Sequence, residues 1–217
     1  IMLSAVAAGA EAEAEPDNLI TFYGFPWYST KGFMESSLQK FGCEPNTKPS
    51  TFIYCTRGTW FDGNYYEGTD CIFDGGIQLI YHDIAIYGHT PSTAALHFMY
   101  PIADIESSCQ DEDTAQLYMA EFHFSGRYLN NLDYIYNDLI DRQSSLYGRG
   151  ENISDDNYFR HIWDDKEGNI SILFMFKSTS ADSSWIKLIF EASGAEDRLD
   201  EIEALLDSMA ESESESE

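Results

Sequence analysis

The sequence predicts an α+β protein built as a tandem helix-and-strands repeat, whose strands form one long antiparallel sheet with the helices on one face. The first observation is a repeated phrase. Phe22-Tyr23-Gly24 precedes a segment ending in Phe41-Gly42, and Phe124-Ser125-Gly126 precedes one ending in Tyr147-Gly148. Both segments have apolar residues at helical spacing, and both are followed by runs that alternate apolar and polar residues, as strands do.

The repeat divides the chain into four parts. Residues 1–18 are a signal remnant and leader, 19–126 the first α+β repeat, 127–210 the second repeat with a C-terminal helix, and 211–217 an acidic tail. The leader from residue 11 and the tail are polar and aperiodic, so we expect both to be disordered. The first helices of the two repeats differ in length by about four residues, which is close to one helical turn. Such a difference leaves the same face of the helix buried in both repeats.

The first unit opens with a short helix that Ser29 or Thr30 can cap and that stops at Gly42. The segment 43–76 that follows is rich in Gly, Pro, Asn, Thr and Tyr, which makes it the least predictable part of the fold. It contains one predicted strand, Thr51–Cys55.

Long strands are expected from Gly76 onward. Ile77–Tyr87 and Thr93–Tyr100 flank Gly88–Ser92, which contains a proline and is typical of a hairpin turn. An acidic loop, Asp104–Thr114, then leads to a strand over Ala115–Phe124, which completes the first unit.

The second unit opens with a helix over Tyr128–Leu146 that ends at Gly148. The next three strands are bounded by tight turns and cover Tyr158–Trp163, Asn169–Lys177 and Ser184–Ala192. A last helix over Glu196–Met209 carries one apolar stripe, and we expect that stripe to pack on the sheet.

Composition restricts the partners of this chain. Hydrophobic residues make up 43% of it, enough to bury a core, while 38 acidic against 12 basic residues give a net charge of −26. Such a charge repels phosphate backbones and anionic lipids, so we expect no nucleic-acid partner and no membrane insertion. No stretch approaches the roughly 20 apolar residues that span a bilayer. A cationic partner fits, although such acidity also simply keeps an exported protein soluble.

The N-terminal residues indicate export. Residues 2–10 resemble the end of a signal peptide, with Ala8-Gly9-Ala10 as a cleavage motif that would leave Glu11 first. A flexible alanine-rich leader is the alternative. Export predicts a secreted or cell-envelope location.

Four cysteines lie in the first half of the chain: Cys43, Cys55, Cys71 and Cys109. Their spacing matches neither a zinc site nor a redox pair, so two disulfides in an exported protein are the prediction. Three connectivities are possible, and four buried thiols are the alternative.

The phrase Ile20–Thr30 resembles the opening of a family of uncharacterised exported bacterial proteins, which read Phe-x-Gly-Ile-Pro-Trp-Gly-Ser-Ser before a helix; here Tyr28 replaces a glycine. The second helix and Trp163, followed by a turn and Ile170–Leu173, also look like that family. The architecture is similar to that of beta-lactamase inhibitor proteins and small outer-membrane assembly lipoproteins. The resemblance implies a non-enzymatic extracytoplasmic module that binds another protein.

Strand alternation suggests where a protein partner would bind. One face collects the apolar side chains, and the other, expected to face solvent, collects charged and aromatic ones. These candidates for a binding face are His97, Met99, Glu121, His123, Trp185 and Lys187. A mixed surface of this kind is used in protein recognition, although an ordinary exposed sheet face is the alternative.

A metal-dependent or acid-base hydrolase is the competing hypothesis. His97, Glu121 and His123 are residue types that bind zinc or transfer protons, but their spacing alone does not bring them to one point. The sequence therefore predicts no catalytic residue, no metal site and no cofactor, and leaves the identity of the partner open.

Overall fold

The computed structural model describes residues 18–40, 53–54, 72–73, 75–81, 84–107 and 110–214. In chain order its helices and strands are α1 (Lys31–Lys40), β1 (Ile53–Tyr54), β2 (Ile72–Phe73), β3 (Gly76–Tyr81), β4 (Thr93–Met99), α2 (Ile102–Glu106), β5 (Gln116–Ser125), α3 (Leu132–Tyr147), β6 (Glu151–Ser154), β7 (Tyr158–Asp164), β8 (Ile170–Phe176), β9 (Trp185–Glu191) and α4 (Ala195–Ser214). The predicted class is confirmed, because the described chain forms one seven-stranded antiparallel sheet with a few helices.

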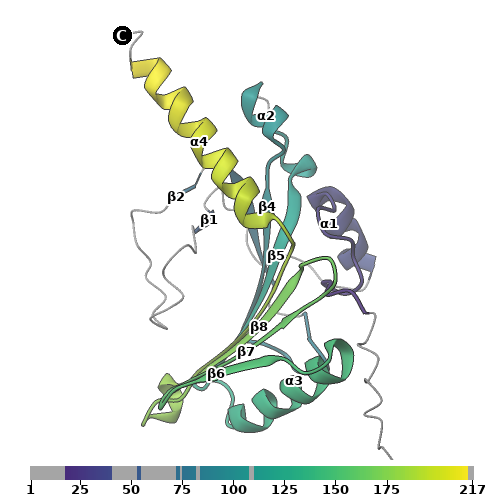
Figure 1. Cartoon of the computed structure of the whole chain (residues 1–217), viewed down its shortest axis with the longest axis vertical. Helices are drawn as coiled ribbons and strands as arrows, with labels where there is room; N and C mark the ends of the chain where they lie inside the picture. The colour runs from purple at the N-terminus through teal and green to yellow at the C-terminus, as the bar shows by residue number, and fades with distance from the viewer. Residues whose placement is uncertain are drawn as a thin grey trace, which may run out of the picture.

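The strand order in this sheet is β3-β4-β5-β9-β8-β7-β6. Read outward from its centre, β5-β4-β3 on one side has the same sequential order as β9-β8-β7 on the other, with β5 and β9 antiparallel to each other. Each set of three follows one helix, α1 or α3 (Figure 1). This symmetry is what two helix-and-strands units would produce, but a duplication of the chain stays a prediction.

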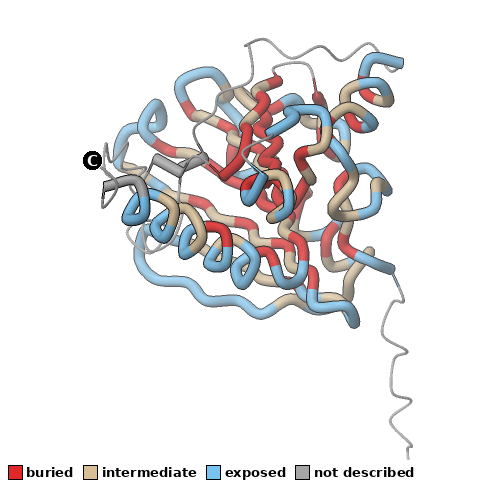
Figure 2. The backbone as a smooth tube through the Cα atoms, turned by 90° about the horizontal axis from the view of Figure 1, so that it is seen from above, coloured by how far each residue is buried: buried red, intermediate tan, exposed pale blue. Residues whose placement is uncertain are grey.

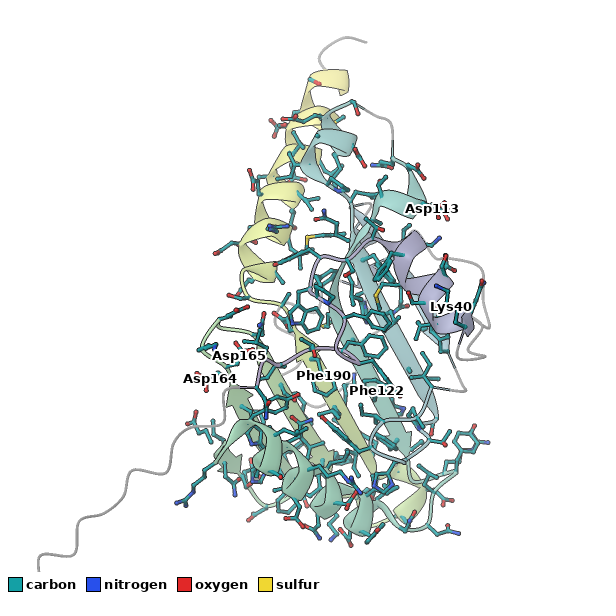
Figure 3. All side chains as sticks on the ribbon, turned by 90° about the vertical axis from the view of Figure 1, so that its right-hand side faces the viewer. Lys40, Asp113, Phe122, Asp164, Asp165 and Phe190 are labelled. Carbon is teal, nitrogen blue, oxygen red and sulfur yellow. The ribbon has the colours of Figure 1, made fainter. Side chains whose placement is uncertain are left out.

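One face of the sheet is covered by helices. Figure 1 shows α1 and α3 on the same side of the strands and α4 on the other side, unlike the arrangement with all helices on one face that the sequence predicts. The ring of Phe122 on β5 contacts Phe22 and Phe190, and Tyr136 of α3 packs against Phe159 of β7. Figure 3, viewed from this side, shows Phe122 and Phe190 on neighbouring central strands. We call this the helix face and the opposite side the second face.

The two glycines of the repeated phrase are needed for different reasons. Gly24 has φ +75° and forms a tight turn with Tyr23, whereas a Cβ on Gly126 would lie 2.0 Å from the carbonyl oxygen of Ala181. The local counterpart of Tyr23-Gly24 is instead Tyr87-Gly88: in both pairs the two φ angles are positive, and in both a bridge joins the flanking residues. Both are therefore turns with the positive φ angles of type I′.

The first unit differs from its prediction at two connections. The strand expected over Ile77–Tyr87 ends at Tyr81, because the Tyr87-Gly88 turn closes Ile86 onto His89 and needs residues outside the ladder. The acidic segment expected as a loop includes the end of α2 and a 3₁₀ turn over Glu112–Thr114. At the start of this turn the Asp111 side chain accepts a hydrogen bond from the Asp113 backbone N–H.

The second unit begins later and ends later than expected. Helix α3 starts at Leu132 rather than Tyr128, and α4 continues to Ser214, four residues into the tail that we expected to be disordered. Glutamate is a good helix former, which favours this extension of α4. Residues 1–17 of the predicted leader, the four cysteines and most of 43–76 lie outside the described residues.

Strand β6 is absent from the prediction because all four of its residues are exposed and it carries no apolar alternation. The chain that leads into β6 contacts the buried ring of Trp163, whose Nε1–H donates a hydrogen bond to the Gly148 carbonyl at 3.2 Å. A Cβ on Gly150 would lie 2.7 Å from that ring, so only glycine lets the backbone pass.

Candidate protein-binding face

The strand registers place all six predicted candidates on the second face. Residues directly opposite one another in a ladder point to the same side of a sheet. His123 stands opposite Lys187, Glu121 opposite both Ala95 and Ile189, and His97 opposite Met119. Met99 and Trp185 lie two residues from His97 and Lys187, so alternation brings them to the same side.

Half of this face is not open to solvent. His97 and Met99 on β4 are 2% exposed, and Lys187 on β9 is 5% exposed. Our expectation that these three side chains face solvent is wrong, because alternation assigns a side chain to a face without showing whether that face is covered. Glu121 and His123 are partly buried beside them. We call this part of the second face, which lies over β3, β4, β5 and the adjoining middle of β9, the covered half.

A buried ion pair occupies the centre of the covered half. Lys187 Nζ lies 2.9 Å from a carboxylate oxygen of Glu121, and both side chains are largely shielded from water. Burial lowers the pKa of Lys187, an effect that its pairing with Glu121 opposes. A pair of this kind is costly to break, because the partner that remains keeps a buried charge without compensation.

The two histidines beside this pair are neutral at physiological pH. Burial, and secondly the charge of Lys187, lowers the pKa of His97 to about 3 and that of His123 to about 4. His97 Nε2 lies 3.5 Å from the Gln78 side-chain nitrogen, and its Nδ1 has no hydrogen-bond partner among the described residues. Both histidines therefore act here as packed neutral rings.

The geometry does not assemble the catalytic group of the hydrolase hypothesis. Thr93, opposite His123, is four residues from His97 along β4, which separates the two histidines by about 13 Å at roughly 3.3 Å per residue. Glu121 lies between them but bonds Lys187. Within the described ranges, no group of three or more His, Cys, Asp or Glu side chains could hold a metal ion.

The other half of the second face exposes a line of aromatic rings. Tyr158 of β7, Phe176 of β8 and Trp185 of β9 are opposite one another in the ladders, and His123 of β5 continues the line. Successive ring centroids are 4.9, 6.0 and 6.4 Å apart. We call these four residues the aromatic row. We call the part of the second face over β6, β7, β8 and the start of β9, where Trp185 lies, the open half.

The helices leave this row accessible. Tyr158 is 36% exposed, and Phe176 and Trp185 are half-buried. Helix α3 packs on the other side of the same strands, where the Tyr136 hydroxyl lies 3.1 Å from His161 Nδ1. On β7 the row contributes Tyr158, whereas α3 contacts His161, three residues further along. Side chains an odd number of residues apart point to opposite faces of a sheet, so the row and α3 lie on opposite faces.

Sequence reasoning found Trp185 and His123 but not Tyr158 or Phe176. Both residues were missed because β8 is apolar at every position except Ser171, so its sequence does not show which side chains share a face with Trp185. Three consecutive strands with an aromatic residue at the same end would have identified the row.

A shallow pocket lies where β9 leads into α4. It is lined by Gly168, Ile170, Glu191 and the first turn of α4. Burial, together with the nearby charge of Glu196, raises the pKa of Glu191 to about 7. Next to it, Arg198 lies over the ring of Tyr28, 3.9 Å from its centroid, and the Tyr28 hydroxyl donates to the Ser193 carbonyl at 2.6 Å.

Tyr28 itself has φ +63°, a left-handed conformation that strains a non-glycine residue. Tyr28 occupies the position at which the family phrase described above has glycine, the residue that adopts this conformation without strain. The contacts of the Tyr28 side chain with Arg198 and Ser193 compensate for the strain.

Comparisons of the chain with models of protein families, with curated proteins and with solved structures found no match. The resemblance to exported bacterial proteins stays a prediction. In the part of the chain that the structure describes, no helix is both long and apolar enough to cross a bilayer.

Proposed function

We propose that this protein is a non-enzymatic module, secreted or in the cell envelope, that binds another protein through the open half of its sheet. The observation that carries the proposal is the aromatic row. Aromatic side chains dominate the energetics of protein interfaces, since they bury a large area at a small cost in conformational entropy.

The row has the properties of an interface core. Its rings contact one another across four strands, so the sheet orders them before a partner arrives. Arg160 and Phe174 lie opposite each other in the next row, beside the rings. Arginine and aromatic residues are enriched at such cores.

The charge of the chain favours a basic partner. The net charge is −26, and the exposed residues beside the open half include Glu151, Asp155 and Asp156. Complementary charge accelerates association and excludes partners that are themselves acidic. The partner we propose is therefore a protein that presents an apolar contact residue surrounded by lysine or arginine.

The experiment is capture from the secreted and envelope fractions of the native source, followed by titration of the purified partner. Phe176→Ala combined with Trp185→Ala removes two rings, and we expect affinity to fall about 1,000-fold, as for two interface residues worth about 2 kcal/mol each. The matched control is Tyr134→Ala, which removes an exposed ring from α3.

A partner that binds the double variant as tightly as the parent would overturn the proposal. So would an equal loss in the control, since Tyr134 lies on the opposite side of the sheet. Circular dichroism of each variant, with its unfolding midpoint, establishes that the sheet is intact.

A further inference from the structure

Strand β6 forms one edge of the sheet. It pairs with β7 on one side, and within the described chain no strand pairs with its other side. Every residue from 151 to 158 is exposed, and Figure 2 shows exposed backbone along this margin. An edge strand presents a row of unpaired N–H and C=O groups that can pair with another chain.

The register identifies which groups point outward. Asp155 N–H donates to the Tyr158 carbonyl at 2.8 Å, so this pair is hydrogen-bonded and closes the β6–β7 turn. Hydrogen-bonded pairs alternate along an antiparallel ladder, which makes Ile153 opposite Arg160 the next one. The backbone groups of Asn152 and Ser154 therefore point away from β7.

Strand β6 is short and carries the charge of Glu151, but it lacks the residues that most directly block an edge. Strand β6 contains neither proline nor lysine. The Ser154 hydroxyl donates to the side-chain oxygen of Asn152 at 2.5 Å, which satisfies side chains but not the outward backbone groups. On the second face, Ile153 is 43% exposed and continues the apolar surface of the open half.

The charges around β6 indicate which kind of strand could pair with it. Glu151 is the first residue of β6, Asp155 directly follows its last residue, and Asp156 comes next in the turn. If two copies paired antiparallel about Ile153, Glu151 of each would stand opposite Asp155 of the other, which is destabilising. An added strand that carries lysine or arginine would instead find opposite charge.

We propose that β6 accepts an extended, basic segment of the partner as an eighth strand, antiparallel or parallel, bonded to the backbone of Asn152 and Ser154. The inference rests on the proposed function, because the segment would enter the same interface as the aromatic row. Main-chain bonds give such strand additions their affinity, and alternate side chains give specificity.

The first experiment uses a fluorescent peptide of about eight alternating lysine and valine residues, compared with the same peptide methylated on alternate backbone nitrogens. Methylation preserves charge and side chains but blocks the ladder. We expect the unmodified peptide to bind at least 10-fold tighter and to protect the Asn152 and Ser154 amides from hydrogen exchange. Equal binding of both peptides, or no protection, would overturn the proposal.

The second experiment changes the edge itself. Ser154→Pro removes an outward N–H without removing a β6–β7 hydrogen bond, while Ser154→Ala changes only the side chain. We expect the proline variant to lose about 10-fold or more in affinity for the peptide and the alanine variant to retain it. Should the proline variant unfold β6, the methylated peptide still decides the question.

The two proposals fail in different ways. A purified partner that requires Phe176 and Trp185 but binds Ser154→Pro unchanged would overturn strand addition and leave the proposed function standing. A partner that is insensitive to the aromatic row would overturn the proposed function, whereas the peptide comparison would still test the edge.

Discussion

The two halves of the second face have the same alternating pattern and opposite environments. In the covered half, His97 and Lys187 are buried around the ion pair with Glu121, whereas in the open half Tyr158 and Phe176 form an accessible line of rings. Period-two alternation decides to which side of a sheet a residue points. Whether that side is covered depends on distant segments, which alternation does not report.

The largest expected effect of a substitution is in the covered half. Lys187→Ala leaves the Glu121 carboxylate buried without its partner, and we expect the free energy of unfolding to fall by about 3 to 5 kcal/mol. Urea unfolding at pH 7 measures it. A loss below about 1 kcal/mol would show that water reaches Glu121 and that the two halves differ less than their burial indicates.

The double substitution Lys187→Met with Glu121→Gln serves as its control. It removes both charges and keeps most of the volume, so it should recover most of the stability.

Glu191, at the end of β9 between the two halves, should make stability depend on pH. Its pKa is raised from 4.5 to about 7 in the folded protein. The folded state therefore holds the proton more tightly, and this contribution is complete below pH 4.5 and lost as the pH rises through 7. Glu191→Gln should abolish this dependence and raise stability at pH 8 by about 3 kcal/mol, since the shift is about 2.5 pKa units and each unit is worth about 1.36 kcal/mol.

Thermal unfolding of both proteins between pH 4 and 8 tests this expectation. The neighbouring charges are Glu196 and, around Tyr28, Arg198. Glu196→Gln is the matched control and should remove only part of the slope, since burial is the larger cause. Parallel curves for the parent and Glu191→Gln would refute the assignment.

Gly150→Ala should loosen the edge of the open half alone. The added methyl would meet the Trp163 ring at 2.7 Å and the Ile162 carbonyl at 2.8 Å. Overpacking of this kind costs about 1 to 3 kcal/mol. Hydrogen exchange should show faster opening of β6 than of β4 and β5. As a control, Gly24→Ala adds a methyl with open space around it but strains a φ of +75°.

The smallest effect on stability is expected at the aromatic row. Phe176→Ala removes a half-buried ring from a surface, so the free energy of unfolding should fall by about 1 kcal/mol or less, the scale of one cross-strand pair. Chemical unfolding beside Lys187→Ala gives the direct comparison. A loss as large as that of Lys187→Ala would mean that the row supports the fold and is not free for a partner.

Much of this fold could be predicted because its helices and central strands repeat apolar residues at fixed periods. β7, β8 and β9 lie within a residue or two of the runs that alternation indicated. β6 could not be predicted, since its four residues are exposed and show no apolar alternation. The turn at Tyr87-Gly88 was missed because a tyrosine in the left-handed region has no reliable sequence signature.

The candidate site could be predicted only in part. That His97, Glu121, His123 and Lys187 share one face follows from alternation, and the registers place them so. The burial of three candidates could not be foreseen, because it depends on packing between segments far apart in sequence. The aromatic row was within reach, yet it required aligning β7, β8 and β9 with one another, and single strands do not give that register.

The strand order also has a consequence for how the chain folds. Every neighbouring pair in the described seven-stranded sheet joins strands consecutive in the chain, except β5 with β9, which are about 60 residues apart in sequence. Bringing β5 and β9 together closes a long loop, which lowers the entropy of the chain before the contacts between the two strands stabilise the pair. We therefore expect the two halves to form early as local hairpins, and the joining of β5 to β9 to limit the rate at which the protein becomes native.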